Sequence, residues 1–132
     1  MTRSYVVIGA YGGVGEALCR RLVQRGARVL MAGRDPRRLA GLAAQIGGEA
    51  FALDATSTGE VEACLRRASE VFGRIDGVAN CVGSLLLKPA HATTDHEWSS
   101  VLATNLGSAF AAVRAAALVM AAYGGSVVLV SS

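Results

Sequence analysis

Residues 5–15 read YVVIGAYGGVG, an apolar run that passes directly into a glycine-rich segment. Glycine weakens both strands and helices, so its concentration here indicates a turn where a strand gives way to a helix. Glycine also permits positive φ angles and lets the backbone come close to a ligand. The start of the following helix offers unpaired N–H groups and a partial positive charge, which suit an anion such as a pyrophosphate.

Apolar runs alternate with segments of helical spacing along the whole chain. Strands are expected at residues 5–9, 28–32, 49–54, 75–81 and 126–132. Helices are expected to begin near residues 13, 36, 58 and 95 and to end at Gly26, Gly47, Gly73 and Gly124. The strands are continuously apolar, which is typical of parallel strands buried on both faces. We therefore predict an α/β doubly wound parallel sheet, in which right-handed crossovers give the strand order 3-2-1-4-5.

Local signals mark where the helices begin. Asp35 is expected to cap a helix that starts with Pro36. Ser57–Glu60 and Thr94–Glu97 both have the spacing of a capping box. The long helix after Thr94 is expected to carry Trp98, Val101, Leu102, Asn105, Ala109, Val113 and Met120 along one side.

Composition excludes several classes of protein. The 132 residues are 52% apolar and 17% charged, which predicts one globular domain. The net charge of +3 is carried mainly by arginines without interleaved aromatic residues, so no nucleic-acid partner is expected. The N-terminus lacks a signal-peptide pattern, and Arg114 interrupts the longest apolar stretch, which favours a buried helix over a membrane span. Three widely spaced cysteines indicate reduced thiols in a cytoplasmic protein, and no metal-ligand cluster is present.

The glycine spacing is G-x-x-x-G-x-G, formed by Gly9, Gly13 and Gly15. It differs from the commoner dinucleotide pattern G-x-G-x-x-G, and no lysine follows as in a Walker loop. The predicted strand order reverses next to this loop, which is where ligands bind in open α/β sheets. A flexible turn at a helix N-terminus remains the alternative.

The end of the second strand bears on which dinucleotide is bound. A carboxylate there would bind the ribose hydroxyls of NAD(H) and repel a 2′-phosphate. Gly33 and Arg34 stand at this point, and a guanidinium grips phosphate well. NADP(H) is therefore favoured over NAD(H). Asp35 is the rival acid, although capping the next helix also explains it.

These motifs resemble the N-terminal half of a short-chain dehydrogenase/reductase, and the resemblance runs from the first strand to the last residue. It implies a Rossmann-like dinucleotide-binding domain over residues 1–132 that is incomplete at its C-terminus. Asp54 matches the family's adenine-contacting aspartate, with a strand-end cap as the alternative, and NCVG at 80–83 stands where the family has Asn-Asn-Ala-Gly. The loop and the resemblance together assign cofactor binding to Gly9, Tyr11, Gly12, Gly13, Val14, Gly15, Gly33, Arg34, Asp54, Ala55, Asn80, Cys81, Val82 and Gly83.

The resemblance also implies two catalytic residues. Asn105 lies in a W-x-x-V-x-x-x-N-L segment, whose asparagine organises water in the family's proton relay. Its alternative is an asparagine that bonds back to its own helix. Ser132, with Ser131 next in line, falls where the family has its catalytic serine.

The family's Tyr-x-x-x-Lys pair would come after Ser132. The resemblance therefore implies hydride transfer between NADP(H) and a small carbonyl or alcohol substrate, with little turnover by these residues alone. The alternatives are a non-catalytic nucleotide-binding module completed by another chain and, more weakly, a structural domain. Val113, Leu118 and Met120 are expected to stay uncovered, which would favour a homo-oligomer.

Overall fold

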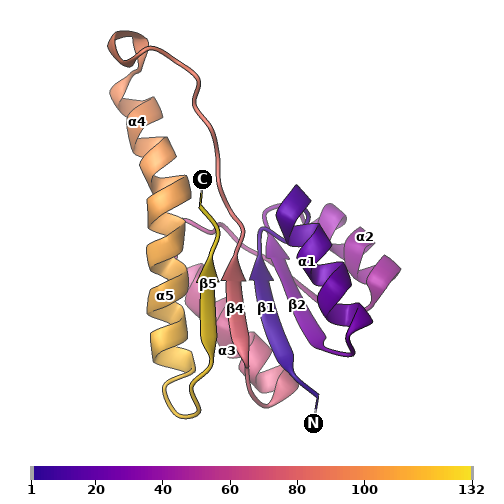
Figure 1. Ribbon diagram of the computed structural model, residues 1–132. Coiled ribbons are helices and arrows are strands. Elements are labelled where there is room, and N and C mark those ends of the chain that lie inside the picture. Colours follow the sequence, from indigo (N-terminus) through magenta and orange to yellow (C-terminus); the bar gives the residue numbers. More distant parts are fainter. Residues whose placement is uncertain (1, 132) are drawn as a thin grey trace.

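The computed structural model describes residues 2–131 as a parallel sheet between two layers of helices (Figure 1). The sheet has the order β3-β2-β1-β4-β5, and every pair of neighbours is parallel. The predicted fold class and strand order are therefore confirmed. The elements are β1 (Ser4–Ile8), α1 (Gly13–Gln24), β2 (Arg28–Gly33), α2 (Pro36–Ile46), β3 (Glu49–Ala52), α3 (Thr58–Phe72), β4 (Gly77–Asn80), a 3-10 turn (Ala90–Ala92), α4 (Asp95–Leu102), a π-turn (Ala103–Gly107), α5 (Ser108–Val119) and β5 (Ser126–Leu129).

The central strands are apolar throughout because both of their faces are covered. In β1, Val6 and Ile8 belong to the apolar cluster beneath α3 and α5, whereas Val7 belongs to the cluster beneath α1 and α2. Adjacent side chains of a strand point to opposite faces, so a strand in the middle layer needs apolar residues at every position. This burial does not extend to the edges. Most of β3 and all of β5 are exposed.

The helices of the first layer cover only part of their face of the sheet. α1 and α2 pack on β1, β2 and β3, as Figure 1 shows, while α3 and α5 lie on the opposite face. An open apolar groove of about 200 Å³ lies beside α1, over β4 and β5. It is lined by Tyr5, Val6, Val7, Leu18, Leu22, Gly77, Val78, Ala79, Ser126, Val128 and Val130.

Two of the three expected helix caps form in full. The Asp35 carboxylate accepts a hydrogen bond from the Arg37 amide at 2.9 Å, and Thr94 and Glu97 bond reciprocally as a capping box. The box at Ser57 forms only in half. Its hydroxyl accepts from the Glu60 amide at 3.2 Å, but the Glu60 carboxylate accepts from the Asp54 amide, also at 3.2 Å. Glu60 therefore ties the helix to the preceding turn rather than to its own N-cap.

The side of the long helix formed by the expected residues is only partly buried, because Val101, Asn105 and Ala109 are half-buried and Met120 is buried. The exposed fractions are 61% for Trp98, 40% for Leu102 and 46% for Val113. The π-turn between α4 and α5 holds one more residue than an α-turn, which rotates the side that the following residues present. The buried side of α5 is formed mostly by small residues, namely Ser108, Ala111, Ala112, Ala115 and Ala116.

A broad apolar side of this helix stays exposed. Val113 and Leu118 are uncovered as expected, whereas Met120 is buried at 5% exposure. Residues 95–119 have the length and composition of a membrane span. Core helices of globular proteins can share both properties, and Arg114 forms an ion pair with Glu62 of α3 at 3.1 Å. Self-association through this side remains a prediction.

The alanine packing between α5 and α3 predicts a sharp response to added volume. Replacing Ala112, which is 0% exposed, with leucine should overpack the contact and lower the free energy of unfolding by about 1–3 kcal/mol. The exposed Ala117→Leu is the matched control on the same helix and should change it by less than about 0.5 kcal/mol. Urea unfolding of the two variants checks this, and equal midpoints would contradict the packing described.

Candidate functional site

A cleft opens where the strand order reverses, at the carboxyl ends of β1 and β4. Its volume is about 260 Å³. In an open α/β sheet this is the expected place for a ligand. Most of the predicted cofactor-binding residues lie around it. The lining consists of Gly9, Tyr11, Gly12, Gly33, Arg34, Leu53, Asp54, Ala55, Thr56, Cys81, Val82, Gly83 and Thr104.

The floor of the cleft is formed by backbone in close contact. Gly9 has a φ of +82°, which favours glycine. A Cβ atom on Gly9 would lie 3.0 Å from both the Cys81 carbonyl carbon and the Val82 nitrogen. The Gly9 and Ala10 amides both donate to the Ala32 carbonyl, at 2.9 and 3.1 Å. The glycine loop is therefore held between β2 and the segment that follows β4.

The glycines at the start of α1 differ in what they make possible. A Cβ atom on Gly15 would collide with the Gly9 carbonyl oxygen, so Gly15 is needed for the helix to pack on the loop. A Cβ on Gly13 would meet nothing within 4 Å, so Gly13 leaves space rather than relieving a contact. The N-cap residue Gly12 has no side chain to bond the first-turn amides of α1. These amides are left for an external acceptor beside Val14, which is 57% exposed.

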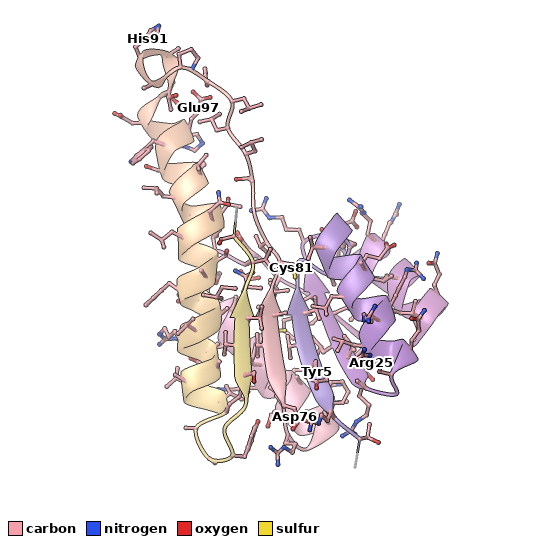
Figure 2. All side chains as sticks on the ribbon, viewed as in Figure 1. Tyr5, Arg25, Asp76, Cys81, His91 and Glu97 are labelled. Carbon is pink, nitrogen blue, oxygen red and sulfur yellow. The ribbon has the colours of Figure 1, made fainter. Side chains whose placement is uncertain are left out.

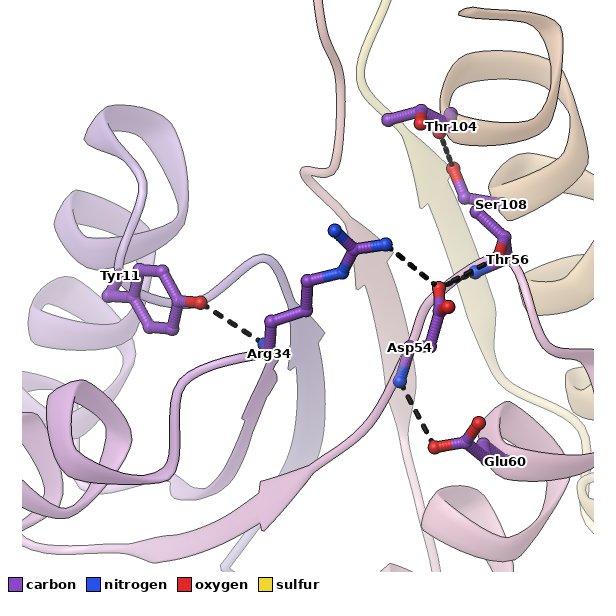
Figure 3. Close-up of polar contacts among 7 residues, drawn as sticks. All are labelled: Tyr11, Arg34, Asp54, Thr56, Glu60, Thr104 and Ser108. Carbon is purple, nitrogen blue, oxygen red and sulfur yellow. Dashed lines mark hydrogen bonds and ion pairs between the residues drawn. The ribbon is translucent and has the colours of Figure 1, made fainter. Parts of the chain in front are cut away.

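Arg34 and Asp54 face each other across one end of the cleft (Figure 3). The Arg34 Nη2 atom lies 3.6 Å from Asp54 Oδ1. The Thr56 hydroxyl and amide donate to the same oxygen at 2.7 and 2.9 Å. These Thr56 bonds, with a smaller contribution from Arg34, lower the pKa of Asp54 below its usual value. Asp54 is therefore an ionised strand-end cap whose carboxylate also lines the cleft.

Asn80 lies behind the wall of the cleft rather than along it. It is 2% exposed, its Nδ2 atom donates to the Ser108 hydroxyl at 3.1 Å, and its Oδ1 atom accepts from the Val82 amide at 3.3 Å. The Ser108 hydroxyl in turn donates to the Thr104 carbonyl at 2.6 Å (Figure 3). Through these bonds Asn80 orients the segment 81–83 and joins it to the long helix. Its predicted contact with a cofactor stays a prediction.

Asn105 sits in the π-turn and connects it to the loop after β4. Its Nδ2 atom donates to the Val101 carbonyl at 2.9 Å, which is the bond back to its own helix that we considered as an alternative. The amide also clamps Ser84: Oδ1 accepts from the Ser84 amide at 3.1 Å, and Nδ2 donates to the Ser84 carbonyl at 3.2 Å. In a π-turn the backbone amides bond five residues back, so a side chain that reaches the carbonyl four residues back supports the wider turn. Asn105 therefore has a structural role, and its part in a proton relay remains untested.

Three residues that line the cleft were not predicted from the sequence. Thr56 follows Asp54 in a turn whose sequence could have indicated the bond between them. Leu53 lines the cleft directly after β3, and Thr104 lines it from the π-turn, which no sequence pattern indicates. Ser132 lies outside the described residues. Within residues 2–131, no group of three His, Cys, Asp or Glu side chains could hold a metal ion.

Known proteins resemble this chain in both sequence and fold. A sequence model of the family described as short chain dehydrogenase matches residues 3–132. D-threitol dehydrogenase from Mycolicibacterium smegmatis is 32% identical over 129 residues, which cover 94% of this chain and 50% of that protein. The chain thus spans about half the length of the curated relatives it matches.

Solved structures extend the likeness to the whole described fold. A short-chain type dehydrogenase/reductase from Mycobacterium ulcerans matches with a TM-score of 0.92 and 28% identity, over 98% of this chain and 51% of that one. An actinorhodin polyketide ketoreductase solved with NADPH gives a TM-score of 0.92 at 24% identity, over 99% of this chain and 53% of that one. At 24% identity, the match to the ketoreductase shows a common fold and nothing more.

The two helix-start glycines should respond differently to alanine. Gly15→Ala places a methyl group against the Gly9 carbonyl and should lower the free energy of unfolding by at least about 2 kcal/mol. Gly13→Ala meets open space in a helix and should leave stability unchanged or raise it by up to about 1 kcal/mol. Chemical unfolding separates the two variants. A loss of stability in Gly13→Ala equal to that in Gly15→Ala would be inconsistent with the contact described.

Cys81, which Figure 2 labels at the carboxyl end of β4, should react slowly with alkylating agents. Burial raises the pKa of its thiol, so less of the reactive thiolate is present at any given pH. The rate of iodoacetamide labelling should therefore still be rising where a free cysteine, with a pKa of about 8.5, has levelled off. Cys81→Ser is the control, because Cys19 and Cys64 are buried with pKa values of about 12. Labelling of Cys81 that levels off below pH 8 would contradict this expectation.

Proposed function

The chain belongs to the short-chain dehydrogenase family, and we propose that it forms the NADP(H)-binding part of an oxidoreductase. The observation that supports this most directly is the cleft at the strand-order reversal, with the bare start of α1 on one side and Arg34 on the other. The substrate proposed for the whole protein is a small carbonyl or alcohol compound. When bound, the nicotinamide cofactor would supply or accept the hydride.

The residues around the cleft fit a dinucleotide. The first-turn amides of α1 have no side-chain cap, and Gly13 keeps the space beside them open. A pyrophosphate would satisfy these amides and benefit from the helix dipole. Gly9, Cys81 and Val82 would position the backbone beneath it. The role of these groups is to bind and orient the cofactor.

The preference for NADP(H) over NAD(H) is proposed from the charges at the end of β2. Gly33 and Arg34 stand at the end of β2, where NAD(H)-binding proteins have a carboxylate. Such a carboxylate would bind the ribose hydroxyls and repel a 2′-phosphate. The nearby acid, Asp35, is engaged as the cap of α2, because its carboxylate accepts the Arg37 amide at 2.9 Å. The Arg34 side chain is 74% exposed, so its guanidinium can leave Asp54 and reach an incoming phosphate.

We also propose that residues 1–132 alone do not reduce carbonyl compounds at an appreciable rate. A forming alkoxide needs an acid, and a positioned acid contributes about 10²–10⁴-fold. The Tyr11 hydroxyl accepts bonds from the Arg34 and Asp35 amides at the end of the cleft. Lys88 lies against Glu97, whose pKa its bond lowers to about 2, near the far end of α4 (Figure 2). Asn105 and Ser132 would then act only together with a tyrosine and a lysine that these residues do not supply.

A second function is supported by the same cleft. The chain would then be a nucleotide-binding module without catalysis, completed by another chain. Steady-state oxidation of NADPH with a panel of aldehydes and ketones bears on this proposal. Robust turnover by the 132-residue chain would refute both the non-catalytic module and the proposal that these residues lack the catalytic acid.

The proposal predicts nucleotide binding that depends on Arg34. Titration monitored by NADPH and NADH fluorescence should show tighter binding of NADPH. Arg34→Gln should weaken NADPH binding about tenfold and leave NADH binding within about twofold, since a charge-assisted bond to the extra phosphate is lost. Arg25→Gln, at the C-terminal end of α1 and outside the lining of the cleft, is the matched control and should leave both unchanged. Absence of binding by either nucleotide at millimolar concentration would refute the proposed function.

A further inference from the structure

Tyr11 reaches from the glycine loop to the turn between β2 and α2. Its hydroxyl oxygen accepts hydrogen bonds from the Arg34 amide at 3.1 Å and the Asp35 amide at 2.9 Å (Figure 3 draws the first). Its ring lies against Gly33, where a Cβ atom would come within 2.8 Å of a ring carbon. A bulkier residue at Gly33 would displace the ring, so these two positions depend on each other. The backbone that carries Arg34 is thus fixed from within the cleft.

The same ring holds a second arginine. The Arg38 guanidinium carbon lies 4.3 Å from the centroid of the Tyr11 ring, within the range of a cation–π contact. Arg38 is exposed, and no carboxylate within residues 2–131 pairs with it. Its charge is therefore held beside a cleft-lining side chain without being neutralised. A charge in that position is available to an anionic ligand.

We propose that Tyr11 is a positioning residue that sets nucleotide specificity by placing both Arg34 and Arg38 for the 2′-phosphate of NADP(H). This inference rests on the proposed function. A phosphate monoester carries a charge of about −1.5 to −2 near neutral pH, which two guanidinium groups can match. The glycine loop contributes no cation, because Tyr11, Gly12, Gly13 and Val14 are all uncharged. The second positive charge comes instead from α2, by way of the tyrosine ring.

A purely structural tyrosine would give a different result from a positioning one. If the ring only filled space and the hydroxyl only satisfied two amides, removing them would affect stability and would weaken NADPH and NADH binding equally. If Tyr11 holds the two arginines for the phosphate, the loss falls on NADPH alone. The ratio of the two dissociation constants therefore distinguishes the two roles.

The experiment compares Arg38→Gln, Arg37→Gln, Tyr11→Phe and Tyr11→Leu in the 132-residue chain. Arg37 is the matched control, because it is an exposed neighbour on α2, whereas the guanidinium over the Tyr11 ring belongs to Arg38. Dissociation constants are measured for NADPH and NADH by fluorescence, and for adenosine 2′,5′-bisphosphate, adenosine 3′,5′-bisphosphate and AMP by calorimetry. Thermal unfolding of each variant reports its stability separately.

Arg38→Gln should weaken binding of NADPH and the 2′,5′-bisphosphate about five- to tenfold, with NADH and AMP within about twofold. Arg37→Gln should keep the wild-type ratio. Tyr11→Phe keeps the ring and should cost less than Tyr11→Leu. The double variant Tyr11→Leu/Arg38→Gln should bind NADPH about as weakly as Tyr11→Leu alone, since Arg38 acts through the ring.

Several results would overturn the inference while leaving the proposed function intact. These are equal losses for NADPH and NADH, full additivity of the Tyr11 and Arg38 changes, or an Arg37→Gln effect as large as that of Arg38→Gln. Equal preference for the 3′,5′-bisphosphate would show that the arginines bind phosphate without recognising its position, which also contradicts it. Failure of the wild-type chain to bind any nucleotide would remove the proposed function and this inference together.

Discussion

The close contact between the Gly9 turn and the backbone of Cys81 and Val82 determines the geometry of the site. Three backbone segments meet there, because α1 also packs Gly15 against the Gly9 carbonyl. Backbone atoms in contact cannot change rotamer, so the spacing between the ends of β1 and β4 is fixed by covalent geometry and hydrogen bonds. The bare amides of α1 and the end of β2 take their positions from this contact. The cleft is therefore part of the fold itself rather than a feature of mobile side chains.

The fold could be predicted because its strongest signals are local. Apolar runs such as residues 5–9 and 28–32 read as continuous strands, since both faces of β1 and β2 are buried, and glycines mark the turns that follow. The buried side of α5 could not be predicted. The π-turn at residues 103–107 changes which side α5 presents, and Asn105 within it is bonded to Ser84, 21 positions away in the chain. Helical spacing assumes a regular turn and shifts the expected side of the helix beyond an irregular one.

The same holds for the site: local patterns identify its residues, whereas the bonds between residues distant in the chain leave no local pattern. Gly9, Arg34 and Asp54 could be identified because each follows a strand whose end is visible in the sequence. The bonds that join them could not. The Tyr11 hydroxyl accepts bonds from the Arg34 and Asp35 amides, which lie 23 and 24 residues away in the chain. The Glu60 carboxylate accepts from the Asp54 amide instead of the N-cap amide expected from the capping box. Pairing across such separations depends on how loops approach in space, which no local pattern records.

The ion pair between Arg34 and Asp54 has a consequence for how ligand entry responds to dissolved electrolyte. An anion that binds Arg34 must replace the Asp54 carboxylate, so one charge pair is exchanged for another rather than created anew. Mobile ions weaken exposed pairs on both sides of such an exchange. The guanidinium should then contribute less to the ionic-strength dependence of association than an arginine that starts without a partner. A carboxylate that occupies the cleft beforehand therefore works as a counterion built into the protein, and because it cannot diffuse away, it stays close to the bound anion and repels it.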